Sequence, residues 1–310
     1  MEIVNTLKQF PPQKIAISIG MFDGFHLGHQ LIIKHLKALA KEQNALSCVI
    51  TYKNHPASVV KDYTIHQICS AEHKISLFKE SGIDLLVFLE FNKELASVSA
   101  KDFLDNIFHQ SQITGIVLGH DAAFGKNRSG TKDFVIEYGK QKNIEVKYLE
   151  PLMLNNARVS STDIRQAILK GDLFYISQLL GRPYSIYGKV IKGLGKGKVI
   201  GFATANIDLT HLVLPPFGVY AIRACVNNKY FKGIANIGIA PTIRNSKEPF
   251  LEVHLFNYEE DLYNSYMNVE FVSQLRNEIK FNSIEELTKQ IDLDVKEAKV
   301  ILESKYGKNL

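Results

Sequence analysis

The segment Gly20-Met-Phe-Asp-Gly-Phe-His-Leu-Gly-His29 decides the expected fold of this chain. It follows an apolar run over residues 14–20 that is typical of a buried strand, and it precedes residues 30–41, where apolar side chains recur at helical spacing. A glycine-rich turn between a strand and a helix N-terminus presents backbone N–H groups, and the helix dipole adds positive potential there. The segment therefore predicts a phosphate-binding turn, suited to a nucleoside triphosphate that is attacked at its α-phosphate.

Two histidines of this turn, His26 and His29, are three residues apart and share one face of the expected helix start. We expect both rings to face whatever the turn binds. The residues alone leave two other interpretations open. The segment could be a structural turn with surface histidines, or the histidines could be a metal pair with Asp23 as the third ligand, although no cysteine is close.

The bulk composition predicts a soluble globular protein of about two domains. Its 310 residues suit domains of roughly 100–200 residues each, and hydrophobic and charged contents of 45% and 22% are ordinary. We find no signal-peptide pattern and no apolar run near the ~20 residues of a membrane span. The net charge of +5 is too small to indicate a nucleic-acid partner. The cysteines are scattered without a CxxC pair, which favours a reducing, cytoplasmic compartment: Cys48, Cys69 and Cys225.

The first half of the chain alternates strand and helix patterns, which predicts a doubly wound parallel sheet. The expected strands cover residues 15–19, 47–52, 85–91, 115–119 and 144–149. The expected helices cover residues 29–43, 71–81, 100–109 and 130–140. Ligands of such sheets bind beyond the carboxyl ends of the strands, at the switch in strand order. The glycine-rich turn follows the first expected strand, as a ligand site of this kind requires.

The second half changes to short strand patterns broken by glycines, which predicts an all-β barrel. The expected strands cover residues 187–191, 219–224, 231–237, 251–256 and 269–271, and a terminal helix covers 283–306. The change in pattern falls near residues 180–185. We therefore expect an α/β domain over residues 1–182 and a barrel domain over residues 183–310.

A second signature, Val159-Ser-Ser-Thr-Asp-Ile-Arg165, opens a helix expected to reach Lys170. Serine and threonine cap free N–H groups at a helix start, which alone would explain the pattern. Together with the histidine motif, the segment resembles the HxGH nucleotidyltransferase superfamily. That resemblance implies that His26 and His29 contact phosphates and stabilise developing charge, with no covalent enzyme intermediate. It also implies nucleotide binding by Gly20, Phe22, Asp23, Gly24, Gly28, Ser160, Ser161, Thr162 and Arg165.

Over nearly its whole length the chain resembles the bacterial bifunctional riboflavin kinase/FAD synthetase family. Residues 51–56 resemble its TFxPHP loop, residues 91–97 its FDxxLAxL segment, and residues 119–125 its GxDFRFG loop on the flavin side. The resemblance implies flavin contacts from Asn54, His55, Asp121 and Phe124.

Residues 188–206 mark the second half, because glycines recur there at intervals of five, four and four. From its residues alone, the segment is either a loop that binds phosphates through its backbone N–H groups or a hairpin of the barrel. It resembles the riboflavin kinase segment that ends in GFPTAN, which implies nucleotide binding by Gly193, Gly197, Gly201, Thr204 and Asn206. In that family the threonine and asparagine also help to hold Mg²⁺.

Two further residues of the second half match functional positions of the family. Glu252 matches the catalytic base, which must reach the reacting hydroxyl; without the resemblance, a lone glutamate in a strand would be interpreted as a surface residue. Arg276 matches an arginine near the flavin and nucleotide sites.

The chain departs from the family at several positions: Ala122, Ala123 and Asp163 in the first half, and Ala203, Ile243 and Asn277 in the second. Ala122 and Ala123 replace an aromatic and a cation, which can supply a stacking and a phosphate contact, so these departures bear on the affinity for the flavin. Ala203 replaces a proline, and ordering an alanine there costs about 0.4–1 kcal/mol more entropy.

The resemblance implies FAD biosynthesis from riboflavin and ATP, with FMN as the intermediate, Mg²⁺ as the metal, and small molecules rather than nucleic acid or membrane as partners. A monomer is compatible with the sequence, which does not determine the oligomeric state. Three alternatives stay open: a monofunctional FAD synthetase with a degenerate kinase domain, a flavin-binding regulator without turnover, and adenylylation of another phosphorylated acceptor such as pantetheine phosphate or nicotinamide mononucleotide.

Overall fold

The computed structural model describes residues 1–8, 10–60, 64–192, 202–241, 247–258 and 260–307. The chain forms two compact units. The first unit contains residues 1–67 and 74–161, and the second contains residues 68–73 and 162–310. Each unit is described on its own below.

The first unit is built on a six-stranded sheet with the order β1-β4-β3-β2-β5-β6. Every neighbouring pair in this sheet is parallel. The strands are β1 (Glu2–Val4), β2 (Lys14–Ile19), β3 (Leu46–Tyr52), β4 (Leu85–Leu89), β5 (Gln112–Gly119) and β6 (Glu145–Leu149). A small hairpin of β7 (Met153–Leu154) and β8 (Ala157–Arg158) follows the sheet.

Helices connect these parallel strands, as parallel pairing requires. They are α1 (Leu27–Glu42), α2 (Pro56–Val60), α3 (Ala71–Ser81), α4 (Lys93–Ser97), α5 (Ala100–Phe108) and α6 (Lys132–Lys142), with a short 3₁₀ turn η1 (Lys126–Arg128). Buried residues of α5 and α6, such as Phe103 and Val135, join one core cluster with alternate residues of the central strands, such as Ile15 and Ile17. Helix α1 packs against β2, β3 and β5 through Ile33, Leu36 and Leu39.

The strand order places the histidine motif at the switch point of the sheet. From β2 the chain runs outward through β3 and β4, and it then returns to the other side of β2 to form β5. Loops at the carboxyl ends of the strands diverge at this point and leave room for a ligand. The motif predicted to bind phosphate directly follows β2 and so lies at the switch point, as expected, and its binding of phosphate stays a prediction.

The second unit contains a closed barrel with the order β10-β13-β12-β11-β14-β9, and all its pairs are antiparallel. The strands are β9 (Ser185–Ile191), β10 (Ala205–Ile207), β11 (Gly218–Val226), β12 (Lys229–Pro241), β13 (Lys247–Leu255) and β14 (Tyr266–Asn277). Helices α7 (Ser161–Lys170), α8 (Leu173–Leu180) and α10 (Ile284–Tyr306) complete the chain.

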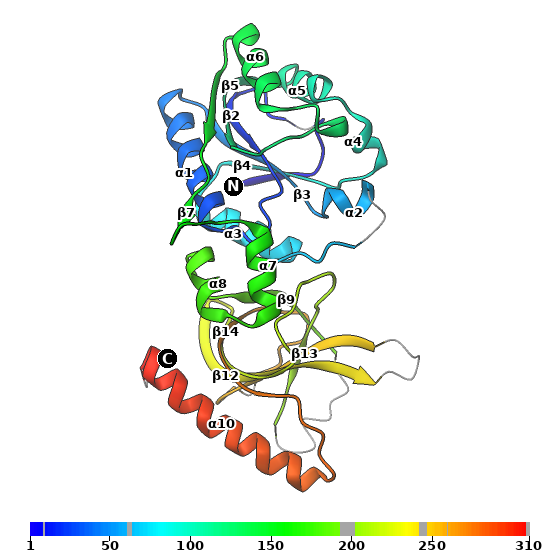
Figure 1. The fold of residues 1–310 in the computed structure, drawn as a ribbon, viewed down its shortest axis with the longest axis vertical. Helices are drawn as coiled ribbons and strands as arrows, with labels where there is room; N and C mark the ends of the chain where they lie inside the picture. The colour runs from blue at the N-terminus through cyan, green and yellow to red at the C-terminus, as the bar shows by residue number, and fades with distance from the viewer. Residues whose placement is uncertain (9, 61–63, 193–201, 242–246, 259, 308–310) are drawn as a thin grey trace. The chain divides into compact units, whose positions relative to one another are not determined.

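The long helix α10 packs on the outside of the barrel, against β11, β12 and β14 (Figure 1). Its buried Ala298 and Leu302 cluster with Val219, Ala221 and Ile234 of the strands. Since side chains alternate along a strand, Val219 faces α10 while its neighbour Tyr220 is fully buried on the other face. The barrel therefore has an apolar interior and an outer face that α10 covers in part.

The predicted fold class is confirmed, and most expected elements differ from the observed ones by a few residues at their ends. Several short elements were not expected: β1, α2, α4, η1, β7, β8, β10 and α8. Strand β1 is a short edge strand that pairs with β4, β10 has three residues, and α8 follows α7 directly. Elements as short as β1 and β10 carry too few side chains to show a periodic pattern.

Candidate active sites

The turn after β2 has an unusual backbone. Gly24 has φ 76°, and two aromatic residues, Phe22 and Phe25, have φ values of 50° and 45°. A positive φ is uncommon for large side chains, and such strained residues cluster at functional sites. Both aromatic rings are buried and pack edge-on against Phe78 of α3, which holds the turn in place.

The two histidines of the motif stack on each other. His26 is the N-cap of α1, and its Nδ1 accepts a hydrogen bond from the His29 backbone N–H at 3.3 Å. The rings lie 3.6 Å apart with an interplanar angle of 17°. Because Nδ1 of His26 accepts a hydrogen bond, its neutral ring carries the proton on Nε2. Gly28 leaves room for this ring, since a Cβ there would lie 3.1 Å from it.

Hydrogen bonds connect the turn to two distant segments of the first unit. The Ser161 hydroxyl donates to the backbone carbonyl of Asp23 at 3.0 Å, across 138 residues of sequence. The Thr51 hydroxyl at the end of β3 donates to the Met21 carbonyl at 2.9 Å. Ser161 of the second predicted signature, residues 159–165, is therefore in contact with the first, residues 20–29.

The remaining residues of the second signature lie on α7. The side chains of Thr162 and Asp163 are exposed and that of Arg165 is half-buried. These residues belong to the second unit. Their contribution to the nucleotide site stays a prediction.

The loop after β3 is fixed by its own side chains. The Asn54 amide donates to the Phe91 carbonyl and accepts from the Phe91 N–H, both at 2.8 Å. The His55 ring accepts from the Ala57 N–H at 3.1 Å. The fully buried Lys74 of α3 donates to the Tyr52 carbonyl at 2.9 Å. Asn54 therefore shapes this loop, and its predicted flavin contact stays a prediction.

Asp121 and Phe124 occupy different environments in the loop after β5. The Asp121 carboxylate pairs with Arg158. Burial raises the pKa of this carboxyl, but the Arg158 hydrogen bond and charge outweigh it and lower the pKa overall. Phe124 is buried in the core, with its ring 5.6 Å from that of Phe103. Flavin contacts by both residues remain predictions.

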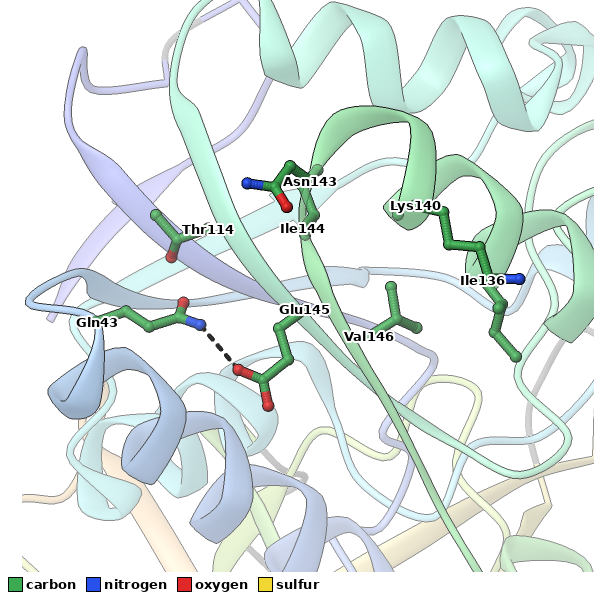
Figure 2. Close-up of a pocket in the computed structure, with 9 residues that line it drawn as sticks. Gln43, Thr114, Ile136, Lys140, Asn143, Ile144, Glu145 and Val146 are labelled. Atoms are coloured by element: carbon green, nitrogen blue, oxygen red, sulfur yellow. Dashed lines mark hydrogen bonds between the residues drawn. The ribbon is translucent and has the colours of Figure 1, made fainter.

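A separate pocket of about 460 Å³ lies near the amino ends of β5 and β6, whereas the histidine turn follows the carboxyl end of β2. Figure 2 shows Gln43 donating to Glu145 across it, and the bond is 3.1 Å long. Lys140 and Asn143 at the end of α6 also line it. None of the residues predicted for catalysis or binding lines this pocket, so it is distinct from the histidine site.

Polar residues form a row across three neighbouring strands of the barrel. Glu252 of β13 is paired with Asn206 of β10 on one side and with Asn236 of β12 on the other. Residues directly opposite each other on antiparallel strands have Cβ atoms about 4.5–5.5 Å apart and share one face. Leu251 and Val253, on either side of Glu252, are buried in the barrel interior. Glu252 therefore lies half-buried on the outer face, flanked by two amides.

Arg276 continues this face on β14, and its guanidinium is held by α10. Its Nε donates to both carboxylate oxygens of Asp294 at 3.0 Å, and its Nη2 donates to Oδ2 at 2.8 Å. Gln290 donates to the same carboxylate at 2.9 Å. Val219 of β11 is paired with both Arg276 and Asn236, which connects Arg276 to the row of Glu252.

The predicted glycine-rich loop is largely outside the described residues. The structure does not describe Gly193, Gly197 and Gly201 of this loop, nor Ile243 of a later segment. Thr204 is half-buried just before β10, two residues from Asn206. Hydroxyl and amide oxygens suit Mg²⁺, which is held mainly by phosphates and water and needs few protein ligands. Within the described part of the chain, no group of three or more His, Cys, Asp or Glu residues forms a metal cluster.

Two protein families match different parts of the chain. Residues 8–163 match the FAD synthetase family, and residues 180–302 match the riboflavin kinase family. A bifunctional riboflavin kinase/FMN adenylyltransferase of Bacillus subtilis is 36% identical over 294 residues, covering 92% of each chain. The chain belongs to the bifunctional riboflavin kinase/FMN adenylyltransferase family.

Other members of this bifunctional family match over a similar length. The enzyme of Buchnera aphidicola from Schizaphis graminum is 37% identical over 90% of this chain and 91% of its own, and that of Escherichia coli K12 is 30% identical over 94% of both. A solved structure described as a macrolide-efflux protein from Streptococcus pneumoniae superimposes with a TM-score of 0.80, at 27% identity over 95% of this chain and 97% of that one.

The family matches leave residues 164–179 outside both domains, whereas the compact units divide after residue 161. The boundary expected at residues 182 and 183 stays a prediction. Among the described residues, no helix is long and apolar enough to cross a bilayer.

Sequence reasoning missed three residues that the fold brings to these sites: Asn236, His254 and Asp294. His254 could have been found by extending the alternation of β13 by two residues from Glu252, whereas Asn236 lies beside Glu252 only through the register of β12 and β13. Asp294 carried no such signal, because its pairing with Arg276 depends on how α10 packs against the barrel.

Proposed function

We propose that this chain makes FAD from riboflavin in two ATP-dependent reactions, one in each unit. The observation that carries the proposal is the presence, in one chain, of a stacked histidine pair at a helix N-terminus and a barrel with a glutamate on its outer face. The first lies in the part that matches FAD synthetase, and the second in the part that matches riboflavin kinase. Members of the family carry both activities in their names.

In the barrel, Glu252 takes the proton from the terminal hydroxyl of the riboflavin ribityl chain. The hydroxyl oxygen then attacks the γ-phosphate of ATP, the bond to ADP breaks, and FMN forms. Asn206 and Asn236 flank Glu252, so their amides can orient the carboxylate and the phosphates. Phosphoryl transfer depends mainly on such positioning and on charge stabilisation.

In the first unit, a phosphate oxygen of FMN attacks the α-phosphate of a second ATP in line, and pyrophosphate leaves. The N-terminus of α1 and the rings of His26 and His29 stabilise the charge that develops on the transferred group. The Ser160 and Ser161 segment lies against the turn through its bond to Asp23 and would hold the departing pyrophosphate with Thr162 and Arg165.

Mg²⁺ would neutralise charge on the ATP phosphates when bound, and Thr204 and Asn206 are the barrel residues suited to help hold it. We further propose that the protein is cytoplasmic, acts on small molecules, and binds neither nucleic acid nor a membrane.

Product analysis tests the proposal directly. The full chain is incubated with Mg–ATP and either riboflavin or FMN, and the flavins are separated by HPLC. FAD from both substrates is the expected result. FAD from FMN alone would indicate a monofunctional FAD synthetase, and binding without any product would indicate a flavin-binding regulator.

A further inference from the structure

The His254 side chain of β13 makes a further contact with the segment that leads into β10. The ladder between these strands begins at Ala205 and Val253. One residue further along β13, the Nδ1 atom of His254 lies 2.9 Å from the backbone carbonyl oxygen of Ala203. A carbonyl oxygen can only accept, so Nδ1 of His254 carries the hydrogen and donates it.

The His254 ring is held by aromatic neighbours. Its centroid lies 5.4 Å from the Phe202 ring in an edge-to-face arrangement, and 6.0 Å from the Phe256 ring. Phe202 precedes Ala203, so the ring contacts the same short segment by packing and by a hydrogen bond. His254 is two residues from Glu252 on β13, so both side chains face the outside of the barrel.

Ala203, whose carbonyl accepts the hydrogen bond from His254, has a backbone that its own side chain restricts little. Ala203 is exposed and lies outside the regular strand. An alanine does not fix its φ angle as a proline would. The next residues, Thr204 and Asn206, are those expected to contact Mg–ATP. The positions of Thr204 and Asn206 therefore depend on the backbone conformation of Ala203, which leads into β10.

We propose that His254 is a positioning residue of the kinase reaction. Its Nδ1–H holds the Ala203 carbonyl and so fixes the segment 202–206 in the conformation that presents Thr204 and Asn206 to the nucleotide beside Glu252. This inference rests on the proposed kinase function of the barrel. His254 acts on the main chain, and it touches no reacting atom.

The test compares full-length variants that separate the hydrogen bond from the ring packing. His254→Leu removes the donor. His254→Asn keeps an N–H donor at nearly the position of Nδ1. Phe256→Leu reduces the packing around the ring and leaves the donor. The first readout is the KM for Mg–ATP in FMN formation, with the KM for ATP in FAD formation from FMN as the internal control.

We expect His254→Leu to raise the KM for Mg–ATP in FMN formation about tenfold, the effect of one hydrogen bond. His254→Asn should restore most of the affinity, Phe256→Leu should change it little, and FAD formation from FMN should be unaffected in all three. Hydrogen exchange of peptides covering residues 202–207 should be faster in His254→Leu than in His254→Asn.

An unchanged KM and unchanged exchange in His254→Leu would overturn the inference. Equal losses in the Leu and Asn variants would also overturn it, since the donor would then not matter. If the unmodified chain forms no FMN, the proposed kinase function fails, whereas faster exchange in His254→Leu would still identify His254 as the group that holds this segment.

Discussion

At the scale of single residues, the histidine pair is the clearest chemical feature of the first unit. The stacked rings of His26 and His29 lie at the N-terminus of α1, where a phosphate is favoured by the dipole and the N–H groups. The motif was readable because its histidines and glycines are close together in sequence. The stacking, and the Ser161 bond to the same turn, became visible only in the folded chain.

Replacing His29 by alanine should lower FAD formation from FMN by roughly 100-fold or more, because it removes a group proposed to stabilise the charge on the transferred adenylyl group. FMN formation from riboflavin should be unchanged, which also reports that the chain is folded. His35→Ala, an exposed histidine of the same helix, is the matched control. Full FAD synthesis by His29→Ala would contradict the assignment of the site.

His73 gives a second prediction at this scale, on stability. Burial, and secondarily the charge of Arg182, lower the pKa of His73 to about 3. The unfolded chain therefore binds a proton that the folded chain rejects, and stability falls as the pH drops from about 6.5 toward 3. The slope is at most about 1.4 kcal/mol per pH unit.

Denaturant unfolding of the wild type and of His73→Phe between pH 4 and pH 8 checks this effect. The free energy of unfolding of the wild type should fall relative to the variant below about pH 6.5, and the difference should be constant above it. A difference that does not change with pH would mean that His73 titrates normally in the folded chain.

At the scale of elements, helix α10 is anchored by a buried ion pair. Asp294 is 2% exposed and receives three hydrogen bonds from Arg276. The strands of the barrel were predictable from alternating apolar residues. The helix was predictable from its helical spacing, but its docking position was not, because many faces of a barrel can accept an amphipathic helix.

Asp294→Ala should lower the free energy of unfolding by about 3 kcal/mol, because it leaves a largely buried guanidinium, whose side chain is 17% exposed, without its carboxylate. The exposed Asp292→Ala is the matched control and should change stability little. Denaturant titration measures both. Exchange of Arg276 and Asp294 together for apolar residues of similar size should recover part of the loss, since the pair is then absent rather than broken.

At the scale of the whole molecule, we expect the two proposed activities to be linked through a diffusible intermediate. The two compact units carry separate sets of reactive groups, with His26 and His29 in one and Glu252 in the other. Each set matches a different family along the chain. We therefore expect the two reactions to be separable by substitution.

Mixing two variants that each lack one of the two reactions tests this independence. His29→Ala should convert riboflavin to FMN but form little FAD, and Glu252→Gln should convert FMN to FAD but lose about 100-fold or more of its kinase activity. An equal mixture of the two should form FAD from riboflavin after a lag in which free FMN accumulates. No FAD from the mixture would mean that both sites must work within one molecule.

The sequence by itself determined the glycine-rich turn with its two histidines, the alternation that makes a parallel sheet, the change to a barrel, and the family resemblance. These features are written in patterns of ten to twenty neighbouring residues, and local periodicity and turn chemistry specify them. The tertiary structure alone decided the contact of Ser161 with Asp23 and the row of Asn206, Glu252 and Asn236. It also decided the pairing of Arg276 with Asp294 and the hydrogen bond of His254 to Ala203. Strand register and helix docking set these contacts, and both depend on how distant segments bury their apolar faces together.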